Sequence, residues 1–243
     1  MGGGLPHGRV GPEENSHVSA HDDLLSRFIL AHTNLGAPPL VPEISLYLAS
    51  DARRIFQDRT EFSPSSDWPP YWAFAWPGGQ GLARYVLDNA QLVAGKSVLD
   101  IGSGSGIGAI AAKRAGARHV ATADPDPMAG VAIGMNARHN GVEIVTLTED
   151  VLSSEPNVDL VLIGDLVYEP DLATRVTRFL ETARDAGIEV ILGDRTTGRR
   201  PPLAMTLLSE YEAPLSPMLE ESHVERARVW RLDKSTRRRE AAT

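Results

Sequence analysis

Residues 98–106 read Val-Leu-Asp-Ile-Gly-Ser-Gly-Ser-Gly, an apolar run that passes directly into a glycine-rich loop. A short apolar run with such a flank is typical of a buried strand. Glycines after a strand let the backbone turn sharply and approach a ligand closely, because they carry no Cβ. An Ala-rich helix is expected next, at Ile107–Ala115, and its first turn would present N–H groups to an anionic ligand group. The stretch therefore predicts a strand, a ligand-binding loop and a helix in succession.

Apolar strands and amphipathic helices continue to alternate along the chain. We expect strands at residues 97–101, 119–123, 144–147, 158–163, 189–192 and 227–232. We expect helices at residues 79–89, 107–115, 172–186 and 203–210, and one that begins at Pro127 and buries Met128, Val131, Ala132 and Met135. This alternation predicts an α/β fold: a doubly wound, mostly parallel sheet with helices on both faces. Ligands of such sheets bind at the carboxyl ends of the strands.

The first 70 residues do not follow this alternation. Residues 1–23 lack an apolar period and are interpreted as a flexible leader. Residues 24–31 are expected to form a helix capped by Asp22 or Asp23, and a second helix is expected at residues 43–56, after a proline-rich break. We therefore expect four segments: a leader at 1–23, a helical extension at 24–70, the main domain at 71–232 and a charged tail at 233–243.

Composition bounds the possible partners. The net charge of −8 and the pI near 5.4 do not favour a nucleic-acid partner. The chain contains no cysteine, which excludes thiol nucleophiles, disulfides and Cys-ligated zinc, and no cluster of metal ligands is apparent, so no metal is expected. No apolar run approaches the ~18–20 residues of a membrane helix, and the N-terminus does not resemble a secretory signal. We expect a cytoplasmic protein that binds neither nucleic acid nor membrane.

Acidic residues end or follow three consecutive predicted strands, at Asp100, Asp124 and Asp150. Asp124 stands about 20 residues beyond the glycine loop, where a carboxylate can accept hydrogen bonds from both ribose hydroxyls. Asp150 is positioned to accept a hydrogen bond from an adenine amino group. These three acids predict an adenosine-containing cofactor, together with the loop residues Gly102, Ser103, Gly104 and Gly106.

Two classes of cofactor fit such a loop. The dinucleotide fingerprint G-x-G-x-x-G/A fails when it starts at Gly102, because Ile107 is sixth, and passes weakly from Gly104, where Ala109 is sixth. A nicotinamide-dependent oxidoreductase therefore stays an alternative. The Asp-x-Gly-x-Gly-x-Gly arrangement that begins at Asp100 resembles motif I of class I methyltransferases. That resemblance favours S-adenosylmethionine over NAD.

Five further stretches carry a closer resemblance: residues 42–44, 67–80, 95–100, 124–130 and 164–168. They are similar to the electron-transfer-flavoprotein β-subunit lysine methyltransferases, and the likeness extends from Pro42 to Trp230. Its most specific parts are the segment Tyr71–Gln80 and the Asp-x-x-Tyr motif at Asp165–Tyr168. The resemblance implies a seven-stranded, Rossmann-like methyltransferase fold, S-adenosylmethionine as cofactor, and lysines of the flavoprotein β-subunit as acceptors.

The resemblance also implies roles for individual residues. Trp76 should lie against the cofactor, and Asp165 and Tyr168 are the catalytic candidates at the methyl-transfer position. Gly193-Asp194 matches a family Gly-Asp pair, but Arg195-Thr196-Thr197 stand where the family has Pro-Gly-Arg, so the chain departs from the family pattern on the acceptor side and not at the cofactor site. Two alternatives stay open on this fold: a small-molecule N-methyltransferase and a non-catalytic cofactor-binding module.

Overall fold

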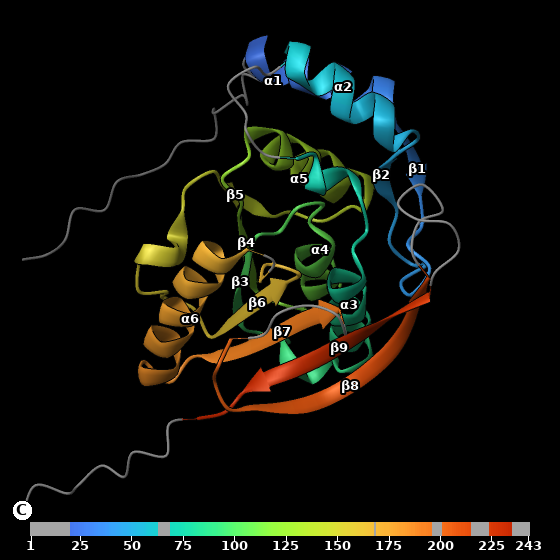
Figure 1. Cartoon of the computed structure of the whole chain (residues 1–243). Helices are drawn as coiled ribbons and strands as arrows, with labels where there is room; N and C mark the ends of the chain where they lie inside the picture. Colours follow the sequence, from blue (N-terminus) through green and yellow to red (C-terminus); the bar gives the residue numbers. More distant parts are fainter. Residues whose placement is uncertain (1–19, 63–68, 168, 196–200, 215–223, 235–243) are drawn as a thin grey trace, which may run out of the picture.

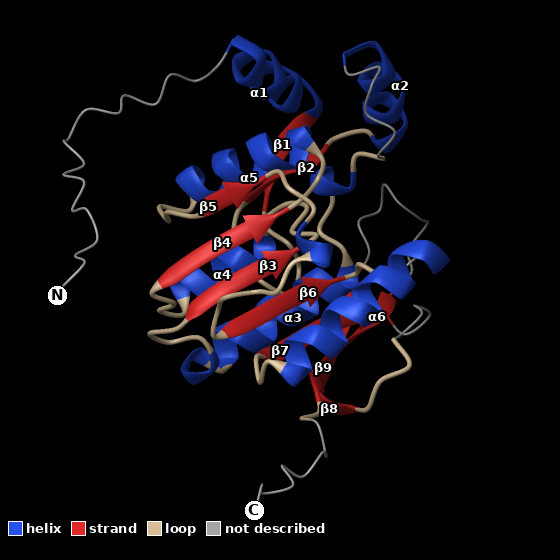
Figure 2. Cartoon of the chain, turned by 90° about the vertical axis from the view of Figure 1, so that its left-hand side faces the viewer, coloured by secondary structure: helices blue, strands red, loops and turns tan. Residues whose placement is uncertain are grey.

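A seven-stranded sheet forms the centre of the computed structural model, which describes residues 20–62, 69–167, 169–195, 201–214 and 224–234 (Figures 1 and 2). The strand order is β5-β4-β3-β6-β7-β9-β8. Neighbours from β5 to β7 pair in parallel, whereas β9 is antiparallel to both β7 and β8. The strands are β3 Ser97–Ile101, β4 His119–Ala123, β5 Val145–Leu147, β6 Leu160–Gly164, β7 Glu189–Arg195, β8 Met205–Pro214 and β9 Val224–Leu232.

Helices cover both faces of the sheet, because the central strands are apolar on both sides. In β6, Leu160 and Leu162 belong to one core cluster, with α3 and α4, while Val161 and Ile163 belong to a second, with α6. Successive side chains of a strand point to opposite faces, so a continuous apolar run suits a strand covered twice. The predicted doubly wound fold is confirmed. These helices are α3 Pro77–Asp88, α4 Ile107–Arg114 and α6 Pro170–Asp185, and the short 3-10 turns are η2 Ala90–Leu92 and η3 Val151–Ser153.

The N-terminal segment packs on α5 (Pro127–His139) at one end of the sheet (Figure 1). Phe28 and Ile29 of α1 share a buried cluster there with Met128 and Ala132 of α5. Pro127 is the first residue of α5, as predicted, and Asp126 caps the helix by accepting a hydrogen bond from Met128 N at 3.0 Å. The elements of this segment are α1 Ala20–His32, β1 Thr33–Gly36, β2 Leu46–Ala49, α2 Ala52–Phe62 and η1 Tyr71–Ala73.

The helix predicted at residues 43–56 is wrong. This stretch contains β2 and only the beginning of α2, and β2 pairs antiparallel with β1, which the sequence analysis missed. Side chains of α5 stabilise the extended conformation: Asn136 Oδ1 accepts from Tyr47 N at 2.8 Å, and Asn140 Oδ1 accepts from Ser45 N at 3.1 Å. These partners are about ninety residues away in sequence, so local periodicity does not reveal them.

The helix predicted at residues 203–210 is also wrong, because β8 occupies this region. Leucines at 203, 207 and 208 imitate a helical period. The strand pairing shifts its register between Leu207 and Ser209, and such an irregularity disturbs the alternation that would reveal a strand. Beyond the shift, Tyr211 and Ala213 are partly or fully buried, and Glu210 and Glu212 are exposed, as a half-covered edge strand requires.

The predicted boundaries at the chain ends change little. Ala20–Asp23 belong to α1, so Asp22 and Asp23 lie in its first turn and do not cap it. The rest of the predicted leader, and residues 235–243 of the predicted tail, lie outside the described residues. Within the described part of the chain, the helices are all too short or too polar to cross a bilayer.

Candidate active site

A cavity of about 440 Å³ lies at the carboxyl ends of β3, β4, β6 and β7. This is the edge where doubly wound sheets bind ligands, and the strand order reverses there between β3 and β6. Most of the predicted site residues meet in its wall: Trp76, Asp100, Gly102, Ser103, Gly104, Asp124, Asp150 and Asp165. Gly106 is not among the lining residues, and Tyr168 lies outside the described residues.

The glycine loop turns under the cavity in a conformation that suits glycine. Gly102, Gly104 and Gly106 have φ angles of 62°, 54° and 81°, in the left-handed region that L side chains rarely adopt. Gly102 N donates to Ala123 O at 2.8 Å, which ties the loop to the end of β4. Gly106 is the residue before α4, and a Cβ there would lie 3.3 Å from Ile133. Gly106 therefore serves the loop turn, while Gly102 and Gly104 face the ligand space.

The Asp100 carboxylate organises this loop from below. Its Oδ2 accepts from Ser103 Oγ at 2.6 Å and from Ala109 N, in the first turn of α4, at 3.0 Å. Burial raises the pKa of Asp100 to about 6, and the hydrogen bonds from Ser103 and Ala109 partly offset that rise. Gly108 leaves the space that the carboxylate fills, because a Cβ there would lie 3.0 Å from Asp100 Oδ2. The described contacts of Asp100 are thus with the loop and the helix.

Asp124 and Asp150 stand at the ends of the neighbouring strands. Asp124 Oδ2 accepts from Gly104 N at 2.9 Å and its Oδ1 accepts from Asp126 N at 3.1 Å; burial raises its pKa to about 6. A carboxylate has about four acceptor positions, so Asp124 retains capacity for ligand hydroxyls. Asp150 is exposed, accepts from Leu152 N at 3.1 Å and pairs with Arg175 of α6. Arg175 also lines the cavity, and the sequence analysis did not anticipate it.

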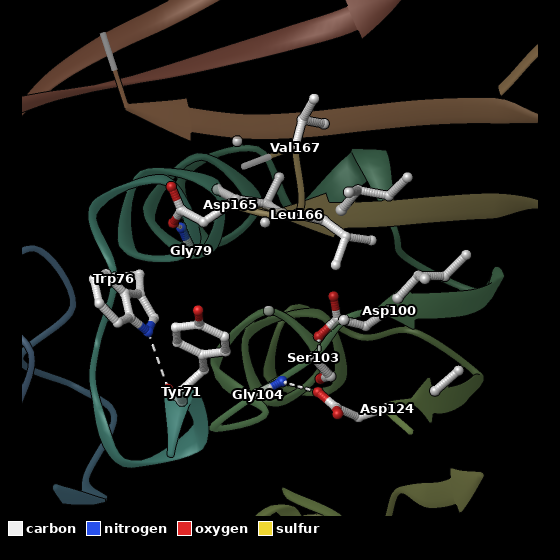
Figure 3. Close-up of a pocket in the computed structure, with 18 of the residues that line it drawn as sticks. Tyr71, Trp76, Gly79, Asp100, Ser103, Gly104, Asp124, Asp165, Leu166 and Val167 are labelled. Atoms are coloured by element: carbon white, nitrogen blue, oxygen red, sulfur yellow. Dashed lines mark hydrogen bonds between the residues drawn. The ribbon is translucent and has the colours of Figure 1, made fainter. Parts of the chain in front are cut away.

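An aromatic wall closes the side formed by residues 71–76 (Figure 3). Trp76 precedes α3, and its Nε1 donates to Tyr71 O at 3.0 Å. The Tyr71 and Trp76 rings meet edge to face, with centroids 5.9 Å apart. Trp72 also lines the cavity and is buried, and its indole N–H has no hydrogen-bond acceptor among the described residues. The wall therefore combines apolar ring faces with one buried N–H donor, that of Trp72, that has no acceptor among the described residues.

Asp165 lies across the cavity from the glycine loop, directly after β6 (Figure 3). It is the only non-glycine residue of positive φ in the described chain, with φ 50°, and Asp and Asn tolerate this region better than most residues. Its Oδ2 accepts from Gly79 N at 2.8 Å, so it caps α3 rather than the helix that follows it. Burial raises the pKa of Asp165 to about 7, against the lowering effects of the Gly79 hydrogen bond and the Arg195 charge.

A close contact between backbones holds Asp165 in place. A Cβ on Gly78 would lie 2.6 Å from Asp165 Oδ1 and 2.7 Å from Gly193 O, so the first turn of α3 sits directly on the ends of β6 and β7. Glycines are costly inside a helix unless close packing requires them. The predicted helix began at Gly79, whereas α3 begins at Pro77. The pair Gly78-Gly79 after Pro77 was therefore a sign in the sequence of a closely packed first helical turn.

The cavity suits an amino-acid-bearing adenosine ligand. Its volume is within the usual range of about 300–1,000 Å³ for small-molecule sites. Gly104 leaves room for close approach, since a Cβ there would have no neighbour nearer than 3.9 Å. Asp124 offers acceptors at the second strand end, and Trp72 offers a buried donor. Among the described residues, no group of three or more His, Cys, Asp or Glu side chains is arranged to hold a metal. These residues fit S-adenosylmethionine.

Known proteins share this fold. The solved structure of a candidate RNA methyltransferase from Pyrococcus horikoshii superposes with a TM-score of 0.50 at 16% identity, covering 70% of this chain and 90% of that chain. The likeness at this identity concerns the fold alone. Fold and site together define a class I methyltransferase, a class of enzymes that use S-adenosylmethionine.

Sequence relatives narrow the class. The family model of ribosomal protein L11 methyltransferase (PrmA) matches residues 82–185. The electron transfer flavoprotein beta subunit lysine methyltransferase of Rattus norvegicus is 39% identical over 198 residues, which cover 79% of this chain and 77% of that protein. Its namesake from Danio rerio is 40% identical over 183 residues, covering 74% and 70%. This chain belongs to the electron transfer flavoprotein β-subunit lysine methyltransferase family.

Proposed function

We propose that this chain transfers methyl groups from S-adenosylmethionine to lysine side chains of the β-subunit of electron transfer flavoprotein. The observation that carries the proposal is the position of Asp165, a carboxylate in the same cavity as the glycine loop but on its opposite side. The relatives from Rattus norvegicus and Danio rerio, which bear this activity in their names, support the choice of acceptor.

The cofactor is proposed to occupy the side of the cavity formed by β3 and β4. Asp124 would accept from its ribose hydroxyls, Asp150 from its adenine amino group, and Gly102 to Gly104 would lie against its amino-acid end. Trp76 would cover it from the aromatic wall. When bound, the cofactor supplies an electrophilic methyl group on a sulfonium centre. Asp100 would act through the loop, because its carboxylate holds Ser103 and Ala109.

The acceptor must first lose a proton. A free lysine has a pKa near 10.4, so deprotonation at pH 7 costs roughly 4–5 kcal/mol, at about 1.36 kcal/mol per pKa unit. An apolar environment and a nearby cation both lower the pKa of an amine. Asp165 has a pKa of about 7, close to the working pH, which suits a group that accepts a hydrogen bond or a proton from the amine.

Asp165 is proposed to orient the amine and to offset the positive charge that develops on its nitrogen. The cap contact with Gly79 N, at 2.8 Å, restricts this carboxylate to one direction. Such restriction matters because much of the acceleration in a displacement comes from holding the reactants in line. Tyr168 is proposed to assist as a second acceptor oxygen, on the strength of the Asp-x-x-Tyr motif.

The test is methyl transfer from isotopically labelled cofactor. The purified chain is incubated with recombinant electron transfer flavoprotein and, separately, with ribosomal protein L11 and with total bacterial lysate. Label is expected in the flavoprotein β-subunit, on lysines identified by mass spectrometry, and L11 is the matched protein control because its methyltransferase family also resembles this chain.

Each possible result decides between candidates. Label in L11 alone would replace the proposed acceptor by a ribosomal one. Label that migrates with small metabolites in the lysate would favour a small-molecule N-methyltransferase. Binding of adenosylhomocysteine without any transfer would favour a non-catalytic module, and binding of NAD in its place would favour an oxidoreductase.

A further inference from the structure

One part of the cavity wall is formed by η3 and the first turns of α6, two elements that pack against each other. Its apolar side chains belong to one hydrophobic cluster: Val151, Leu152, Leu166 and Leu172. Ligand sites of this kind are mostly apolar and are made specific by a few polar groups at fixed places. The polar group here is Asp150, directly before η3, which is the acceptor proposed above for the adenine amino group.

The Asp150 carboxylate is held by two different elements. Its Oδ1 accepts a hydrogen bond from Leu152 N at 3.1 Å, within its own loop. Its Oδ2 accepts a hydrogen bond from the guanidinium of Arg175, which belongs to α6. A carboxylate has about four acceptor positions, so each oxygen retains one for a ligand. The two contacts together set the direction in which these remaining acceptors point.

Arg175 lies on the side of α6 that faces the cavity. It stands three residues after Leu172, and residues at that spacing share one face of a helix. Both side chains line the cavity. Within the described part of the chain, Asp150 is the hydrogen-bonding and ion-pair partner of the Arg175 guanidinium. Arg175 therefore connects α6 to the loop after β5 at the cavity wall.

A second carboxylate in the same wall has no such contacts. Glu149 precedes Asp150, lines the cavity and is exposed. None of the described residues donates a hydrogen bond to its side chain or forms an ion pair with it. The wall thus carries a negative charge at Glu149 as well as the paired charge of Asp150. Of the two acids, Asp150 is the one whose direction is fixed.

The ion pair between Arg175 and Asp150 contributes little to the stability of the fold. Their side chains are 42% and 48% exposed, and pairs with that exposure are weakened by water and by salt. Its effect on a ligand is expected to be larger, because a side chain that is already oriented loses little further rotamer freedom when the ligand binds. The pair should therefore affect recognition more than folding.

We propose that Arg175 is a positioning residue for cofactor recognition: it orients the Asp150 carboxylate toward the 6-amino group of adenine, and so selects adenine over bases with an oxygen at that position. A carboxylate accepts a hydrogen bond from an amino group, whereas a carbonyl oxygen offers it no proton. The inference rests on the placement of adenine at Asp150 in the proposed function, and it adds the residue that makes this contact selective. It does not depend on the identity of the methyl acceptor.

Two ligands that differ in the base alone test the proposal. Adenosylhomocysteine and S-inosylhomocysteine share the ribose and the amino-acid group, but the second has an oxygen in place of the 6-amino group. Competition calorimetry gives the dissociation constant of each, and their ratio measures base selectivity without any methyl transfer. The wild type is expected to bind adenosylhomocysteine about tenfold more tightly or better, because the contact is a charge-assisted hydrogen bond.

Four variants assign the selectivity. Arg175→Gln should lower the ratio about threefold or more, because the Asp150 carboxylate is then free to take other directions. Asp150→Asn keeps an oxygen for Leu152 N but replaces the other oxygen by an NH₂ group, so its ratio should be about one. The double variant should have the ratio of Asp150→Asn alone, since Arg175 acts through that carboxylate. Glu149→Gln is the matched control: it removes a carboxylate that Arg175 does not contact, and it should keep the wild-type ratio.

The ratios test the two residues separately. A wild-type ratio in Arg175→Gln, or a double variant that differs from Asp150→Asn, overturns the positioning role of Arg175. A wild-type ratio in Asp150→Asn, or no selectivity in the wild type, also overturns the contact between Asp150 and adenine. The melting temperature of Arg175→Gln should stay within about 3 °C of the wild type, so that a changed ratio does not reflect a damaged fold. Failure to methylate the flavoprotein would refute the proposed acceptor and would leave these ratios unaffected.

Discussion

Two substitutions of Asp165 separate its part in stability from its part in catalysis. Asp165→Asn keeps the shape of the side chain, tolerates the φ of 50°, and retains an oxygen that can accept the hydrogen bond from Gly79 N. Asp165→Ala removes that acceptor and places an alanine in the left-handed region. The first variant removes the charge, and the second also removes the cap.

The structure gives the size of the stability effect. Loss of a helix cap costs about 1 kcal/mol, and an alanine at positive φ costs about 1 kcal/mol more. Asp165→Ala should therefore melt roughly 4–8 °C lower, at roughly 2–4 °C per kcal/mol for a domain of this size. Burial holds the pKa of Asp165 at about 7 in the folded protein, above the ordinary value of 3.8 for an aspartate. The stability linked to its proton is fully present below about pH 4, where the carboxyl is protonated in both states, and is lost as pH rises to about 7, so the neutral Asn should match the wild type at about pH 4 and exceed it at about pH 8.

The assay combines thermal melting at both pH values with initial rates of methyl transfer to the flavoprotein. Both variants should lose about a hundredfold in rate or more, as expected for removal of a group that stabilises developing charge. A fall in melting temperature for Asp165→Asn as large as that for Asp165→Ala would show that charge, rather than the acceptor oxygen, holds α3. Full activity of Asp165→Asn would refute the catalytic role.

Three other predictions concern the frame around the cavity and its buried carboxyls. Gly193→Ala should lower the unfolding free energy measured in urea by about 3 kcal/mol, because the new Cβ meets the backbone of Gly78. Gly36→Ala is the control: its new Cβ would lie 3.6 Å from Leu48 Cδ1, so the unfolding free energy should change by less than about 0.5 kcal/mol. Equal losses in the two variants would contradict the close contact at Gly193. The ribose hydroxyls of adenosylhomocysteine would donate hydrogen bonds to Asp124, so ligand binding should lower the pKa of Asp124 from about 6 and release protons near that pH. Calorimetry in two buffers of different ionisation heat measures this release, and identical heats would count against it. Without ligand, the unfolding free energy should fall as pH rises from about 4 to about 7, since the pKa values of Asp124 and the other two buried carboxyls are raised from 3.8 to about 6 or 7. A chemical-denaturation series on Asp124→Asn should show a shallower fall, and an unchanged slope would exclude Asp124 as a cause.

The cofactor side of the cavity was largely predictable from local sequence. The strand at residues 97–101 and the loop glycines are each defined within a few residues, by apolar character and by positive φ. The strand-end rule then brings Asp124 and Asp150 into the same wall. The direction of each carboxylate was not predictable in this way, and Asp100 turned out to serve the loop and α4.

The acceptor side depended on residues that are distant in sequence. Asp194 receives its hydrogen bond from Trp230, which lies in a strand that reverses direction relative to β7. The pattern of residues 203–210 concealed the partner strand β8, because a register shift breaks its alternation. A single sequence records the apolar and acidic residues of this region, but the pairing that assembles them is a property of the sheet.

Local chemistry determined the parallel centre of the sheet and the glycine loop from the sequence alone, since backbone conformation and burial there depend on neighbours a few residues apart. The tertiary structure decided where the hairpins form and what each carboxylate contacts. Asp165 is the clearest case: its motif marks it from the sequence, yet its partner is Gly79, 86 residues earlier. The two chain segments meet at that hydrogen bond only because α3 packs on the ends of β6 and β7. Contacts between segments so distant in sequence do not alter the hydrophobic periodicity of either one, so the sequence alone does not reveal them.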